Sequence, residues 1–159
     1  MLSQPSPAIK TRPNRIVLLG VGNDLHADDA AGLLVIRALE ARLGSSPNVL
    51  LIEGGITPEN FTGSIRRFGA DWVIFIDAAN LEVEPGTIEV LPIEQVDGFS
   101  ASSHMQPLSV LAKFITRDVG CQVGVIAIQA QSLEMEQAVS GAVMVGVNEL
   151  VEEFCQLLI

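Results

Sequence analysis

The sequence has few cysteines and no long apolar segment. Its 159 residues include only two cysteines, Cys121 and Cys155, and they form no CxxC pair. This spacing argues against a zinc-finger type of site, and in a reducing compartment we expect both thiols to be buried and inert. No apolar run reaches the roughly eighteen residues that a membrane span requires, so none is predicted.

Cations are also scarce. Nine Lys and Arg residues stand against 19 Asp and Glu residues, which gives a formal net charge of −10. Because affinity for nucleic acid depends largely on Lys and Arg contacts to phosphate, this balance argues against a nucleic-acid partner. It is compatible with a cationic protein partner or a metal cation.

The chain is predicted to form one domain with a short leader. Hydrophobic residues make up 48% of the sequence and charged residues 18%, which excludes a disordered protein. Residues 1–15 carry three prolines and three cations without an apolar signal-peptide core, so we expect a flexible leader and a cytoplasmic protein. Residues 16–159 contain no repeat or long linker and are expected to form a single domain.

Apolar runs alternate with helical patterns along the chain. Short runs predict strands at 16–20, 49–52, 72–76 and 123–128, and an alternating run between prolines predicts a half-exposed edge strand at 88–90. Amphipathic patterns predict helices at 31–39, 57–69, 108–115 and 139–154, the second with a Thr57 cap and Pro58 in its first turn. This order predicts the α/β class, a three-layer fold with a mostly parallel, twisted sheet of about five strands and helices on both faces.

Acidic residues follow several of the predicted strands. Gly20-Val21-Gly22-Asn23 leads into Asp24–Asp29, the second strand ends at Glu53-Gly54-Gly55, and the central strand ends at Asp77. In such sheets ligands bind outside the carboxyl ends of the strands, where the strand order reverses. We therefore expect an acidic site at this edge. A desolvated Asp77 requires a cation, hydrogen-bond donors or a proton.

Simpler roles compete with a ligand site. Gly20-Val21-Gly22 resembles half of a dinucleotide fingerprint, but Leu25 occupies the position of the third glycine, so a sharp turn is the alternative. Asp28 and Asp29 could complement the dipole of the following helix, and Asp77 could cap a turn.

One histidine completes a possible metal site. His104 lies in the small polar segment Ser100–His104, where it could be a ligand or simply solvated; His26 is the other histidine of the chain. Asp29, Asp77 and His104 offer two oxygens and one nitrogen, a set that suits a borderline divalent ion with positions left open for water or substrate. Without His104, the same carboxylates would suggest an acid/base pair.

Other catalytic patterns are poorly represented. The sequence has no GxSxG elbow and no HExxH motif, and both cysteines lie in apolar surroundings. A serine next to His104 does not by itself indicate a triad.

An ordered set of motifs resembles the [NiFe]-hydrogenase maturation endopeptidases. The resemblance covers roughly residues 16–143 and is most similar to the hydrogenase 3 branch, because of Pro58-Glu59-Asn60 and because position 29 is Asp rather than Glu. The matching segments are Gly20-Val21-Gly22-Asn23, Asp28-Asp29-Ala30-Ala31-Gly32, Gly54-Gly55, Pro58-Glu59-Asn60, Ile76-Asp77-Ala78-Ala79, Pro85-Gly86-Thr87-Ile88 and Ser103-His104-Met105-Gln106-Pro107-Leu108, with weaker matches at Ile128-Gln129 and Ser140–Val143.

The resemblance implies a single α/β peptidase domain of the phosphorylase/hydrolase-like kind over residues 16–159. It implies an endopeptidase that removes the C-terminal extension of the hydrogenase large-subunit precursor after nickel insertion. It places the catalytic, metal-contacting positions on Asp29, Asp77 and His104, with nickel supplied by the substrate and other divalent ions able to substitute.

The sequence departs from the family pattern at two places. Ala127 and Ala130 stand where glycine and proline are expected, which changes a turn expected to contact substrate. Ser102-Ser103 precede the histidine where threonine is expected. Neither departure affects the three proposed ligands.

Several mechanisms and functions remain open from the sequence. A bound ion could lower the pKa of a water or polarise the scissile carbonyl, or Asp29 or Asp77 could act as general base. A metallochaperone or checkpoint module that binds the precursor without cutting it is one alternative. A peptidyl-tRNA hydrolase is another, but the acidic charge argues against it and His26 is only a rough match for its histidine.

Overall fold

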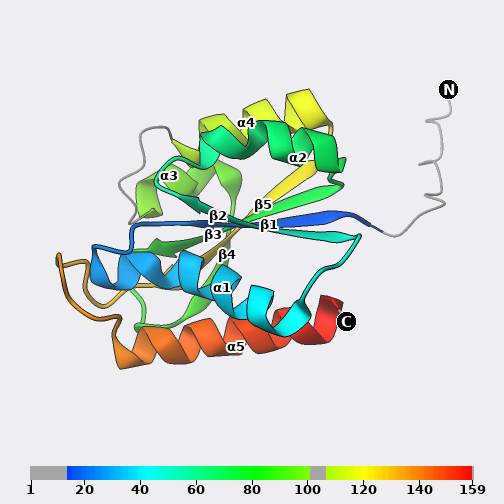
Figure 1. The fold of residues 1–159 in the computed structure, drawn as a ribbon. Coiled ribbons are helices and arrows are strands. Elements are labelled where there is room, and N and C mark those ends of the chain that lie inside the picture. The colour runs from blue at the N-terminus through cyan, green and yellow to red at the C-terminus, as the bar shows by residue number, and fades with distance from the viewer. Residues whose placement is uncertain (1–13, 101–106, 159) are drawn as a thin grey trace, which may run out of the picture.

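A five-stranded sheet forms the middle layer of the computed structural model, which describes residues 14–100 and 107–158. The strand order is β2-β1-β3-β5-β4; all neighbours are parallel except β4, which runs antiparallel to β5 (Figure 1). The predicted mostly parallel sheet is therefore confirmed. The strands are β1 (Ile16–Val21), β2 (Val49–Gly55), β3 (Trp72–Ala79), β4 (Ile88–Leu91) and β5 (Gln122–Gln129).

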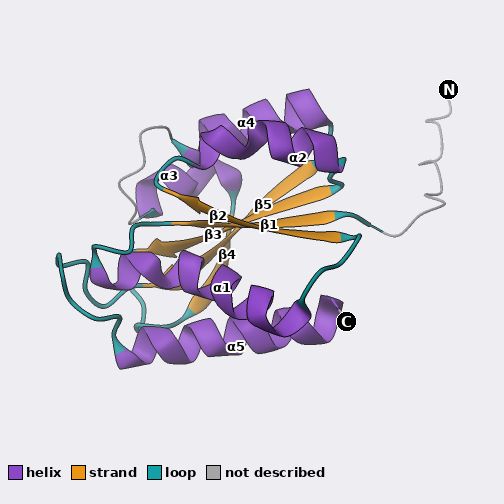
Figure 2. Ribbon diagram, in the orientation of Figure 1, coloured by secondary structure: helices purple, strands orange, loops and turns teal. Residues whose placement is uncertain are grey.

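Helices cover both faces of the sheet (Figure 2). One face carries α1 (Ala31–Leu43) and α5 (Gly141–Leu158), and the other carries α2 (Thr62–Phe68), α3 (Val96–Phe99) and α4 (Leu108–Val119). Three single 3₁₀ turns are η1 (Ala27–Ala30), η2 (Pro58–Phe61) and η3 (Ile93–Gln95). None of the helices in the described ranges has the length and hydropathy to cross a membrane.

The side chains of the central strands alternate between two apolar layers. In β1, Leu19 packs in the layer under α2 and α4, whereas Leu18 packs in the layer under α1 and α5. Both side chains are fully buried. Continuous apolar strands are stable here because each face of the sheet is covered.

The predicted strands are all present and all are longer than predicted, two of them by three residues. β2 and β3 each continue three residues further, to Gly55 and Ala79. The extension of β3 arises because residues 77–79 stay paired with β5. The predicted edge strand is confirmed as β4 at the end of the sheet. The four-residue α3 was not predicted, since one turn has no detectable period.

The predicted helix at 57–69 consists of two parts, η2 and α2. Thr57 is the N-cap residue, but the predicted side-chain cap is wrong, because Thr57 makes no capping bond through its hydroxyl. The amide of Asn60 instead donates to the carbonyl oxygen of Thr57 at 3.1 Å, as a 3₁₀ turn requires. Gly69 ends α2 in the left-handed conformation, φ 70°, as predicted.

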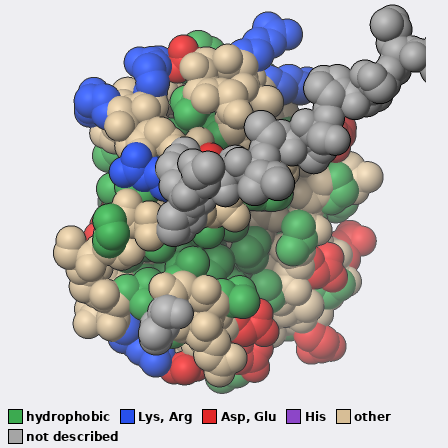
Figure 3. Space-filling view, turned by 90° about the vertical axis from the view of Figure 1, so that its right-hand side faces the viewer, with side chains coloured by type: hydrophobic (Ala, Val, Ile, Leu, Met, Phe, Trp, Pro, Cys, Tyr) green, Lys and Arg blue, Asp and Glu red, His purple; other side chains and the backbone are tan. Residues whose placement is uncertain are grey.

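Hydrophobic side chains are visible at the edge of the sheet where the four parallel strands begin (Figure 3). Figure 3 views this edge and shows hydrophobic side chains gathered between the layer of α2 and α4 above and the layer of α5 below. Asp29 and Asp77 lie at the other edge, where β1 and β3 end.

The first turn of α1 lies directly on the ends of β1 and β3. A Cβ atom added to Gly32 would lie 2.2 Å from the carbonyl oxygen of Ile76 and 2.7 Å from that of Val21. Both contacts are to backbone, which cannot rotate away. Gly32 therefore fixes the distance between α1 and the two central strands.

We predict that Gly32→Ala lowers the free energy of unfolding by about 3 kcal/mol, because the added methyl forces α1 off the sheet. Gly141→Ala in α5 is the matched control, since nothing lies within 4 Å of its added Cβ. It should change stability by no more than about 0.5 kcal/mol. Urea denaturation of both variants measures this, and equal stabilities would contradict the packing argument.

Candidate functional site

The candidate site lies where the strand order reverses. After β1 the chain passes to β2 on one side, and it then returns to β3 on the other side of β1. The connections that follow β1 and β3 thus diverge, which leaves room for a ligand at their carboxyl ends. Asp29 follows β1, and Asp77 is the third residue from the end of β3.

Asp77 is held inside the sheet edge. It pairs in register with Ala127 of β5 and is 2% exposed. The hydroxyl of Ser100 donates to Asp77 Oδ2 at 2.6 Å. Asp77 was expected at the end of its strand, but β3 continues two residues beyond it, which explains its deep burial. It shares the sheet face with Phe75, the face that α2 and α4 cover.

Ser100 is a neighbour of the site that sequence reasoning did not single out. It forms an antiparallel bridge with Ala79, and the amide of Asn80 donates to the carbonyl oxygen of Phe99 at 2.9 Å. These contacts align the end of α3 along the end of β3. Because 23 residues separate Ser100 from Asp77, no local pattern in the sequence indicates the contact.

Asp29 lies against the end of β1. It belongs to η1 and is 2% exposed, and its carbonyl oxygen accepts from the amide of Asn23 at 3.3 Å. A Cβ atom on Gly22 would lie 1.9 Å from that carbonyl oxygen and 3.8 Å from Asp29 Oδ1. With φ 149°, Gly22 also adopts a conformation that other residues rarely reach. The predicted sharp turn is therefore present, and it positions Asp29.

The neighbouring Asp28 has a different role. It is fully buried and accepts hydrogen bonds from the amides of Gln131, Ser132 and Ser140 at 2.8, 2.9 and 2.7 Å, and from the Ser140 hydroxyl. Rather than complementing a helix dipole, its carboxylate ties η1 to the segment before α5, more than a hundred residues away. Asp28 thus stabilises the turn that carries Asp29.

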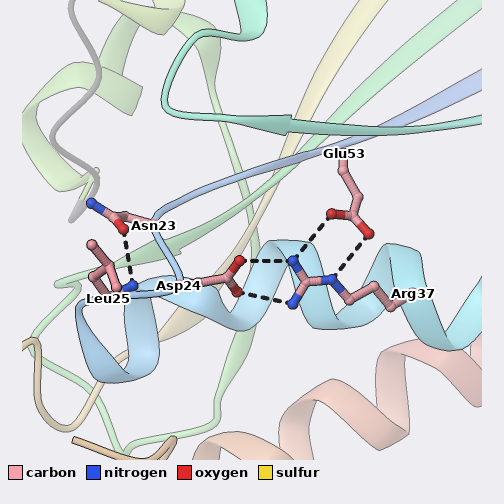
Figure 4. A network of polar contacts seen from close by, with 5 residues as sticks. All are labelled: Asn23, Asp24, Leu25, Arg37 and Glu53. Carbon is pink, nitrogen blue, oxygen red and sulfur yellow. Dashed lines mark hydrogen bonds and ion pairs between the residues drawn. The ribbon is translucent and has the colours of Figure 1, made fainter. Parts of the chain in front are cut away.

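Arg37 of α1 braces the outer side of the same edge (Figure 4). Its guanidinium donates to both carboxylate oxygens of Asp24, at 2.9 and 2.8 Å, and to both of Glu53, at 3.0 and 3.1 Å. The hydrogen bond from Arg37 lowers the pKa of Asp24, against the opposing effect of burial, and the two carboxylates raise the pKa of Arg37. The network links the segment after β1 to β2.

The third predicted site residue, His104, lies outside the described residues. Within residues 14–100 and 107–158, no group of three His, Cys, Asp or Glu side chains could hold a metal ion. Asp29 and Asp77 are nevertheless at the carboxyl ends of adjacent strands, since Gly20 pairs with Ile76. Carboxylates in this position can coordinate a divalent ion or accept a proton from water.

A mostly parallel sheet with buried acids at its switch point is typical of α/β domains that bind a ligand at the carboxyl edge. Residues 33–159, well over half of the chain, match the model of the family described as HycI, hydrogenase maturation protease. The chain therefore belongs to the hydrogenase maturation protease family, and with it to the peptide hydrolases. The resemblance stated from the motifs is confirmed.

Solved structures and a curated relative are similar to the chain. The [NiFe] hydrogenase maturation protease HycI from Thermococcus kodakarensis KOD1 superposes with a TM-score of 0.82 and 32% identity, covering 91% of this chain and 92% of that one. The endopeptidase HycI from Escherichia coli gives a TM-score of 0.77 and 26% identity, with 87% of both chains covered. The hydrogenase 3 maturation protease of E. coli K12 is 32% identical over 105 residues, 65% of this chain and 66% of the relative.

We predict that Asp28→Asn lowers the free energy of unfolding by about 3 kcal/mol, because an amide turned towards several N–H donors leaves some of them unsatisfied. Asp24→Asn is the matched control in the same segment. Its partner is the exposed Arg37, so it should cost at most about 1 kcal/mol. Urea denaturation measures both, and an Asp28 variant as stable as the Asp24 variant would contradict the anchoring role.

Proposed function

We propose that the protein is an endopeptidase that removes the C-terminal extension of the nickel-loaded precursor of a [NiFe]-hydrogenase large subunit. The observation that carries this proposal is the pair of buried carboxylates, Asp29 and Asp77, at the switch point of a chain that belongs to the hydrogenase maturation proteases. Both thiols are buried and free, which fits a reaction in the reducing cytoplasm.

Nickel belongs to the substrate in this proposal. Asp29, Asp77 and His104 complete its coordination, and other borderline divalent ions can substitute. His104 follows Ser100 by four residues, and four residues span at most about 14 Å. Because the Ser100 hydroxyl contacts Asp77, the chain itself limits how far the imidazole can lie from that carboxylate.

Metal recognition would place the scissile amide next to the carboxylates. Water then adds to the carbonyl carbon and its proton passes to a base. The base returns this proton to the leaving nitrogen as the tetrahedral intermediate collapses, so that the C–N bond breaks and the extension is released as an amine. Asp29 or Asp77 serves as the base, or the metal lowers the pKa of the water. Positioning of this kind contributes several kcal/mol, about 7–11 in the best cases.

One alternative function is recognition of the nickel-loaded precursor without cleavage. A checkpoint module would use the same acids to bind nickel-loaded precursor and would leave its mass unchanged. Membership of a protease family favours cleavage, and it argues against the peptidyl-tRNA hydrolase interpretation. The mass of the precursor after incubation separates the two remaining functions, because only the protease releases a C-terminal peptide.

We predict that Asp29→Asn, Asp77→Asn and His104→Gln each reduce processing of nickel-loaded precursor by at least about 100-fold, because each removes a proposed ligand or base. Glu149→Gln, an exposed substitution on α5, is the control. Mass spectrometry of the precursor over time measures cleavage, and circular dichroism shows that the variants are folded. Wild-type rates in both aspartate variants would overturn the site.

A further inference from the structure

A groove lies beside the candidate site on the sheet face that Asp77 shares. It has a volume of about 400 Å³ and is formed by the first turns of η2–α2 and α4. Both segments begin at the carboxyl edge, because η2 follows β2 and α4 follows the segment that pairs with the end of β3 (Figure 1). The groove is lined by Glu59, Thr62, Val110, Leu111 and Phe114.

Glu59, which lines the groove, has a carboxylate oxygen that lacks a partner within the described residues. Glu59 Oε2 is buried and makes no hydrogen bond there. Buried polar atoms in native proteins are almost always paired, so such an oxygen calls for a specific explanation. The cations of the adjacent α2 are engaged elsewhere: Arg66 pairs with Asp118, and Arg67 donates to Ser64.

Apart from Thr62, the remaining lining is apolar, and part of it is accessible. Val110 and Phe114 are 53% and 49% exposed. A metal ion is a poor match, since it requires several oxygen or nitrogen ligands and Glu59 is the only carboxylate among the described residues that line the groove. A long cationic side chain fits both parts, because its methylene stem packs on apolar surface while its charged end pairs with a carboxylate.

The same chemistry occurs within this chain. The guanidinium of Arg15 lies over the ring of Phe68, 4.4 Å from its centroid. Phe114 offers an equivalent exposed ring in the groove, so a guanidinium or ammonium that pairs with Glu59 can also contact an aromatic face.

We infer that this groove is a specificity subsite that binds an arginine or lysine side chain of the protein substrate. The inference rests on the proposed function, because it assigns the cation to the precursor that is cut at the same edge of the sheet. Glu59 supplies the charge, and Val110 and Phe114 supply the apolar wall. The subsite holds the precursor in register while the metal is recognised at Asp29 and Asp77.

Kinetics on nickel-loaded precursor test the subsite. Glu59→Gln should raise KM about tenfold or more with little change in kcat, since one charge-assisted pair is lost. Glu89→Gln, an exposed substitution on β4, should leave both constants unchanged. Each Lys and Arg near the precursor's C-terminus is changed to Gln in turn. With wild-type enzyme, one of these precursor variants should raise KM as much as Glu59→Gln does with the unchanged precursor. With the Glu59→Gln enzyme, the same precursor variant should raise KM no further.

A binding experiment separates this inference from the proposed function. The peptide acetyl-Leu-Arg-Leu-amide should shift the amide resonances of residues 59–62 and 110–114, whereas its citrulline counterpart and the Glu59→Gln variant should show no such shift. Equal shifts with both peptides, or an unchanged KM in Glu59→Gln, overturn the subsite while cleavage by the wild type still supports the protease. If the peptide binds at Glu59 but the wild-type protein does not cleave nickel-loaded precursor, the proposed protease function is overturned instead.

Discussion

The direct backbone contact between α1 and the two central strands is the constraint on which the carboxyl edge depends. Gly32 meets the carbonyl oxygens of Ile76 and Val21, and Gly22 meets that of Asp29, at distances that leave no room for a methyl group. These contacts draw η1 against the sheet. As a result, Asp29 reaches the end of β1 while Asp77 remains one strand away in β3.

The adjacent residues Asp28 and Asp29 have different roles: Asp28 is structural, and Asp29 is proposed to take part in the chemistry. The carboxylate of Asp28 is surrounded by amide and hydroxyl donors from the segment before α5, which satisfy most of its acceptor capacity. It is therefore a permanent cross-link between distant parts of the chain. Asp29 belongs to the same turn, η1, so the position of its backbone depends on the hydrogen bonds of Asp28.

The sequence was sufficient for local features and insufficient for contacts between distant residues. Continuous apolar runs such as that of β3 predicted the four parallel strands, because strands covered on both faces must be apolar, and an alternating run predicted the edge strand β4. Glycines predicted turns where φ is positive. The hydrogen bond from Ser100 to Asp77 and the linkage of Asp28 to Ser140 depend on how separate loops meet. Neither contact leaves a periodic signal in the sequence. The sequence therefore placed the acidic residues at one edge of the sheet, but it could not distinguish the structural role of Asp28 from the proposed ligand role of Asp29 and Asp77.

The burial of Asp29 and Asp77 bears on how substrate selection can work in the proposed protease. A carboxylate has about four acceptor sites, so a hydrogen bond such as that from Ser100 still leaves coordination capacity for a cation. Water is largely excluded from both side chains, and an ion brought by the substrate therefore interacts with them more strongly than it would at an exposed surface. In the proposed protease, a precursor without its metal would offer no such compensation for docking against two acids, and their burial would therefore favour the metal-loaded form.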